Sequence, residues 1–145
     1  MNTTKAINAI ASEYGISAAN GQYVASDPKN KYIVMLLNNM NKRLSDPKFA
    51  STEARFLLDT VIGTNDISTL IMQMARVYIE DFYEADAIQE VMKMIDPSGK
   101  MHRDDLIDTL TDMVTKAVVD PSSTEFGTVS KINNTILNFV RKRFN

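Results

Sequence analysis

The chain has 145 residues, 44% of them hydrophobic and 23% charged, with a formal net charge of −2. These values are ordinary for one globular domain and exclude a wholly disordered chain. There is no cysteine, no tryptophan and a single histidine, His102. The inventory excludes a disulfide framework and any cysteine-based zinc site, and it argues against most enzymes that work through thiolates or histidines.

Targeting and membrane segments are not indicated. Residues 1–5 are polar and lack the apolar core of a secretory signal. The longest strictly apolar run, Tyr32–Leu37, is too short to span a bilayer. We therefore expect a cytoplasmic or intracellular protein that has no contact with a membrane.

Four Asp-Pro pairs divide the chain, at 27–28, 46–47, 96–97 and 120–121. Such pairs mark turns and helix starts, because Asp caps free N–H groups and Pro suits the first helical turn. Between them, apolar residues recur at three- and four-residue steps, which is the spacing of a helix face. The predicted elements begin with a helix ending near Gly15, a loop over 15–26, a helix over 28–44 and a short helix over about 51–63. One long helix over about 66–94 is favoured next, with a break around 83–86 as the alternative. A helix that includes 106–117 follows, and a last helix from about 122 contributes a basic segment, 126–145.

No stretch combines strand alternation with hairpin signals. The sequence therefore predicts an all-α protein, organised as a single-domain bundle of five or six helices over residues 1–145.

Two short motifs suggest chemistry but lack its context. The turn from Asp96 to His102 resembles the start of a calcium loop, yet its fifth position is Lys100 and its twelfth is Ile107, so two oxygen ligands are missing. His102-Arg103-Asp104 matches a kinase catalytic triplet, but the chain has no glycine-rich loop to accompany it. We interpret the segment as an ordinary connection between helices and predict no catalytic residue, cofactor or metal site.

Charge is distributed unevenly along the chain. Residues 80–112 hold ten acidic residues against three basic ones, a formal charge of −7, whereas residues 126–145 hold four basic residues and no acidic one. Acidic residues at four-residue intervals share one face of a helix. The predicted acidic face consists of Glu80, Asp81, Glu84, Asp104, Asp105, Asp108 and Asp112.

The first functional hypothesis follows from this asymmetry and from the missing catalytic residues. We expect a non-enzymatic interaction protein that docks on a basic partner protein or assembly through the acidic face, or that forms a homo-oligomer. Twelve asparagines with few glycines fit a viral accessory or inhibitory protein, such as one from a phage with an AT-rich genome.

Two alternatives stay open. The basic C-terminal helix, through Lys131, Arg141, Lys142 and Arg143, is a candidate for weak, salt-sensitive binding of nucleic acid. The clustered carboxylates are candidates for a Mg²⁺-dependent enzyme, although a solvated acidic face is the commoner arrangement.

Overall fold

The structure, a computed structural model, describes residues 3–45, 67–82 and 85–144. The predicted all-α class is confirmed: the described residues form six α-helices, one 3-10 turn and little strand. The short helix predicted over 51–63 lies outside the described residues. The helices are α1 (Thr3–Glu13), α2 (Lys31–Leu44), α4 (Ile67–Phe82), α5 (Ala85–Ile95), α6 (Arg103–Val119) and α7 (Thr124–Phe144).

The chain groups into two compact units, Met1–Ala75 and Arg76–Asn145. Each unit is described by itself, and the prediction of one domain over the whole chain stays a prediction. No described helix is long and apolar enough to cross a membrane.

In the first unit, α1 and α2 each bury one apolar stripe at helical spacing, as the sequence predicts. On α1 the stripe includes Ile7 and Ile10, each 1% exposed, and on α2 it includes Leu36 and Leu37, both fully buried. A 3-10 turn, η1 (Pro28–Asn30), precedes α2, and the Asp27 carboxylate caps it by accepting a hydrogen bond from the Lys29 backbone N–H. The expected role of this Asp-Pro pair at a helix start is therefore confirmed.

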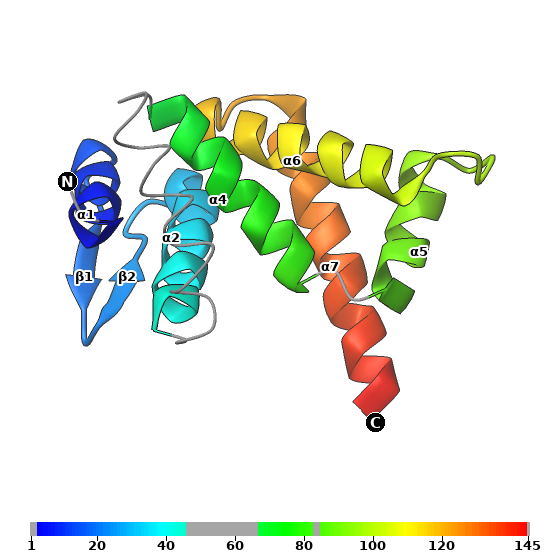
Figure 1. Ribbon diagram of the computed structural model, residues 1–145, viewed down its shortest axis with the longest axis horizontal. Helices are drawn as coiled ribbons and strands as arrows, with labels where there is room; N and C mark the ends of the chain where they lie inside the picture. The colour runs from blue at the N-terminus through cyan, green and yellow to red at the C-terminus, as the bar shows by residue number, and fades with distance from the viewer. Residues whose placement is uncertain (1–2, 46–66, 83–84, 145) are drawn as a thin grey trace. The chain divides into compact units, whose positions relative to one another are not determined.

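The segment 15–26, expected to be a loop without strands, contains a β-hairpin. Strands β1 (Ser17–Ala19) and β2 (Gln22–Val24) pair antiparallel around a two-residue turn (Figure 1). The turn residues, Asn20 and Gly21, have φ values of 54° and 79°. A type I′ turn requires such left-handed values at both positions, and Asn-Gly is the dipeptide that adopts them most readily. Each strand has only three residues, too few to show the alternation of apolar and polar residues that predicts a strand, so the hairpin was not predicted.

A side chain of α2 fixes the hairpin. The Asn38 amide donates to the Tyr23 carbonyl oxygen at 3.0 Å and accepts from the Tyr23 backbone N–H at 2.8 Å, as a neighbouring strand would. The Tyr23 ring is 7% exposed, and its hydroxyl donates to Asn8 Oδ1 of α1 at 2.7 Å. Three polar residues thus join the hairpin to α1 and α2.

The second unit is built around α7, which packs against both α5 and α6 (Figure 1). Its core collects the buried stripes of these helices and of the end of α4. The described apolar residues of this unit that are at most 3% exposed are Ile79, Ala87, Ile88, Val91, Leu106, Ile107, Leu110, Val114, Ala117, Val118, Val129 and Ile132.

The favoured single helix over 66–94 is wrong, and the alternative of a break around 83–86 agrees with the structure. The helix α4 ends at Phe82 and α5 begins at Ala85, with residues 83–84 outside the described residues. Burial gives the physical reason. If α4 continued straight at about 100° per residue, the buried stripe of α5, centred on Ile88 and Val91, would be rotated by roughly 120° from that of α4, centred on Ile71 and Tyr78. One straight helix cannot bury both stripes against one core.

Two similar turns flank α6. The Asp96 carboxylate accepts hydrogen bonds from the Ser98 hydroxyl and from the backbone N–H groups of three residues, which are Ser98, Lys100 and Met101. These bonds lower the pKa of Asp96, with the Ser98 hydroxyl contributing most. Asp120 accepts from the backbone and hydroxyl of Ser122, which lowers its pKa as well. The interpretation of 96–102 as an ordinary connection agrees with this geometry, because the turn itself uses both oxygens of Asp96.

Candidate functional site

The outer face of α6 gathers four of the predicted acidic residues. Asp104, Asp105, Asp108 and Asp112 are all exposed. At about 100° per residue they fall within an arc of roughly 100°, on the side of the helix opposite the buried residues. Among those buried residues, Leu106 and Leu110 are at most 1% exposed. Burial of the apolar stripe therefore determines which way the carboxylates point.

Arg76 of α4 connects two members of the predicted acidic face. Its guanidinium donates to Asp108 Oδ1 at 2.7 Å and pairs with Glu80 Oε1, one turn along α4, at 3.5 Å. The hydrogen bond to Asp108 is the main reason why the pKa of Arg76 is raised. Glu80 and Asp108 are thereby placed on either side of one guanidinium, and part of their charge is balanced.

The other residues of the predicted acidic face lie on α6, on α4 or outside the described residues. Within the described part of the chain, no ion pair involves Asp104, Asp105 or Asp112. Asp104 and Asp105 lie in the first turn of α6, where the helix dipole stabilises negative charge. The backbone of Asp81 belongs to α4, but its side chain lies outside the described residues, as does Glu84. The candidate site therefore consists of the α6 row, which is Asp104, Asp105, Asp108 and Asp112, and of Glu80, which Arg76 connects to Asp108.

Catalytic and metal chemistry gain no support from the residues that the structure describes. His102 is exposed at the N-terminal cap of α6 and makes no side-chain capping bond. No group of three or more His, Asp or Glu side chains in this part of the chain is arranged to hold a metal ion. The proposal of a carboxylate-based enzyme therefore has no described site on which to rest.

The described basic side chains of α7 do not all lie in one row of the helix. Lys131 and Lys142 are exposed and lie in one row of the helix, but they are eleven positions and about 16 Å apart. Arg141 is also exposed, yet it points roughly 100° away from that row. The backbone of Arg143 is helical, and its side chain lies outside the described residues. Two separated cations in one row offer only a weak footprint for a phosphate backbone.

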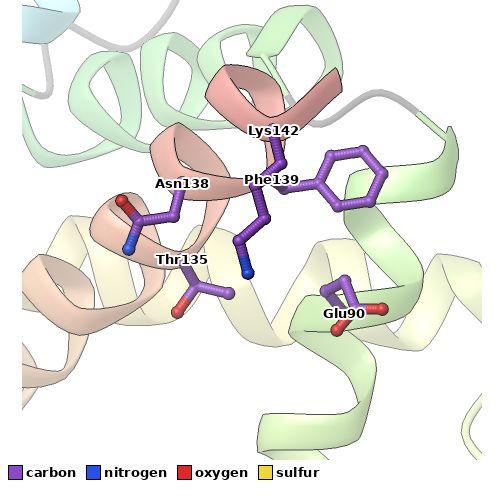
Figure 2. A pocket seen from close by; sticks show the side chains of 5 residues that line it. All are labelled: Glu90, Thr135, Asn138, Phe139 and Lys142. Carbon is purple, nitrogen blue, oxygen red and sulfur yellow. The ribbon is translucent and has the colours of Figure 1, made fainter. Parts of the chain in front are cut away.

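A hollow of about 400 Å³ lies between α5 and α7 (Figure 2). One wall is Glu90 of α5, and the other is a single face of α7 made by Thr135, Asn138, Phe139 and Lys142. The positions i, i+3, i+4 and i+7 on α7 are readable as one face from the sequence. That Glu90 faces them could not be predicted, because it depends on how α5 packs on α7.

The residues that the structure describes define an all-α protein with a row of exposed carboxylates on α6. Comparisons of the chain with models of protein families, with curated proteins and with solved structures found no match. Arguments about function therefore depend on the residues of this chain alone.

Proposed function

We propose that this protein is a non-enzymatic interaction protein that docks on a basic partner protein through the outer face of α6. One observation carries the proposal: four exposed carboxylates fall within one arc of α6, opposite its buried stripe. Charges of one sign on one face attract a complementary surface and accelerate the encounter with it.

The spacing of the row favours an extended basic surface over a single cation. Asp104, Asp108 and Asp112 succeed one another at about 6 Å along the helix axis. A partner with several Lys or Arg side chains in a groove can meet all of them at once. In its sharpest form, the proposal is that the row occupies a basic channel that otherwise takes the phosphates of a nucleic acid, as an inhibitory viral accessory protein would.

The test compares two changes of net charge of equal size. Asp108→Lys with Asp112→Lys changes the row without touching the first turn of α6, where lysines would oppose the helix dipole. Glu13→Lys with Gln89→Lys and Asn134→Lys is the matched control, because it changes the net charge by the same amount at exposed positions of other helices and outside their first turns. Each variant and the unchanged protein are used to capture partners from a lysate of the source cells, and helicity is measured by circular dichroism.

The proposal predicts a basic protein that the unchanged chain and the control retain at physiological salt and that the α6 variant loses. Reversing Asp104 and Asp105 as well should then abolish the remaining binding. Equal capture by all forms would contradict the proposal. Steeply salt-dependent binding of the purified chain to DNA or RNA, lost when residues 141–145 are deleted, would instead favour the alternative on α7.

A further inference from the structure

The hollow between α5 and α7 is lined by charges of opposite sign. Glu90 supplies a carboxylate from α5, and Lys142 supplies an ammonium from α7 (Figure 2). Glu90 pairs with Lys93 of its own helix at 3.3 Å, and no ion pair of Lys142 occurs among the described residues. Among the residues that line the hollow, Glu90 thus offers a carboxylate that Lys93 partly balances from outside the lining, and Lys142 offers an ammonium from the other wall.

The remaining lining residues divide in the same way. Asn138, beside Lys142 on α7, offers an amide N–H to an anionic group, whereas the Phe139 ring extends toward α5 (Figure 2). An aromatic face attracts a cation that lies within about 6 Å of it. The Thr135 hydroxyl donates to the Lys131 carbonyl oxygen at 2.9 Å, so toward the hollow it can only accept. One end of the hollow therefore suits an anion, and the other suits a cation.

We propose that this hollow binds a small zwitterion of the amino-acid or short-peptide class. The ligand's ammonium would lie against Glu90 and Phe139, and its carboxylate against Lys142 and Asn138. The charge pattern disfavours the simpler ligands, because Glu90 repels a phosphate and Lys142 repels a polyamine. The hollow is open to solvent on one side, and its volume of about 400 Å³, at the small end of the range of roughly 300–1,000 Å³ for ligand sites, admits an amino acid or a dipeptide that stays partly exposed. This site is independent of the docking face proposed on α6.

The test is a titration of the full chain followed by amide NMR, with the common amino acids and glycyl dipeptides as probes. Each probe is also used in its N-acetylated form, which lacks the ammonium, and in its C-terminal amide form, which lacks the carboxylate. The proposal predicts saturable shifts at residues 88–92 and 135–142 with at least one free zwitterion. Loss of either charge should weaken that binding about tenfold.

Variants of the lining residues complete the test. Glu90→Gln and Lys142→Met should each weaken binding by a similar factor, whereas Lys142→Arg should retain it. Glu125→Gln and Lys131→Met, which change charges elsewhere on α7, are the controls and should bind like the unchanged chain. Because the substituted side chains are not buried, an unchanged amide spectrum away from the hollow verifies that each variant folds. Absence of shifts at about 10 mM of every free zwitterion, a weak limit for a specific site, would overturn the proposal. Equal binding of the acetylated forms, or full affinity in both charge variants, would overturn it as well.

Discussion

Polar side chains serve different purposes in the hairpin and on the outer face of α6. Around the hairpin, Tyr23 of β2 forms hydrogen bonds with Asn38 of α2 and Asn8 of α1, and Tyr23 is only 7% exposed. On α6 the carboxylates are exposed, and Arg76 is the one described side chain that forms an ion pair with any of them, through Asp108. The comparison teaches that bonded, half-buried polar groups hold a fold, while unpaired exposed charges of one sign are available to a partner.

This difference predicts a separation of effects. Changes to the hairpin residues should lower the free energy of unfolding and leave binding through α6 intact once the protein is folded. Changes to the α6 carboxylates should do the reverse.

The largest effect is expected beneath the acidic row, at Leu110. This side chain is 1% exposed, and Leu110→Ala removes its buried methyl groups and leaves a cavity. The free energy of unfolding, measured by urea denaturation, should fall by about 2–5 kcal/mol. Leu137→Ala on α7 is the matched control, because Leu137 is 52% exposed. The control should change stability by less than about 0.5 kcal/mol, and similar losses in both would disprove the assignment of the α6 core face.

The second-largest effect is expected at Asn38 of α2, whose side-chain amide bonds the N–H and the C=O of Tyr23 in the hairpin. Asn38→Ala leaves the N–H and C=O of Tyr23 without their side-chain partner, so stability should fall by about 1–3 kcal/mol. Asn134→Ala, on an exposed position of α7, should have almost no effect in the same urea titration. Asn38→Asp keeps the acceptor for the N–H but loses the donor to the carbonyl, and it should therefore also be destabilising. If Asn38→Ala were as stable as the unchanged chain, the two hydrogen bonds of the Asn38 amide would not stabilise the fold.

The sequence predicted most of the helices because each one buries a stripe at regular spacing, as Ile7 and Ile10 do on α1. The hairpin could also have been predicted from Asn20-Gly21, the dipeptide that suits a type I′ turn. The hydrogen bonds between Asn38 and Tyr23 could not be predicted, because the two residues are fifteen positions apart and nothing in the local pattern relates them. Long-range pairing of polar groups depends on packing, which periodicity does not encode.

The same distinction applies to the candidate site, where the residues on one helix face could be predicted and their partners on other helices could not. The four-residue spacing from Asp104 to Asp112 was enough to place those carboxylates on one face. The pairing of Asp108 with Arg76, 32 positions away, and the approach of Glu90 to α7 depend on how helices pack. Local spacing therefore predicts the content of a helix face, whereas the partners of that face come only from the tertiary structure.

The third prediction concerns the turns at the two ends of α6. Because the folded pKa of Asp96 is lower than its ordinary value of 3.8, its carboxylate stabilises the fold above about that pH. The contribution is lost as the pH falls through the lower, folded value. Asp96→Asn should destabilise the protein at neutral pH and make the decline below pH 4, followed by urea titrations at several pH values, shallower.

Asp120→Asn gives the comparison for that experiment. Among the described residues, the Asp120 carboxylate accepts hydrogen bonds from Ser122 alone, whereas the Asp96 carboxylate accepts them from Ser98, Lys100 and Met101. The acid sensitivity should therefore change less in Asp120→Asn than in Asp96→Asn. An identical decline in both variants and in the unchanged chain would show that other groups determine acid unfolding.

The smallest effect on stability, and the sharpest test of the contrast, is expected at Arg76. Its pairs with Asp108 and Glu80 are exposed to solvent, and such pairs contribute about 0–1 kcal/mol. Arg76→Gln should therefore leave the urea midpoint almost unchanged. It also removes the positive charge that balances two carboxylates, so a basic partner should associate faster and the association rate should depend more steeply on salt. Arg103→Gln, an exposed arginine that forms no described ion pair, is the control for the loss of one charge. If Arg76→Gln slowed association instead, Arg76 itself would belong to the docking surface, and the carboxylate row alone would not explain recognition.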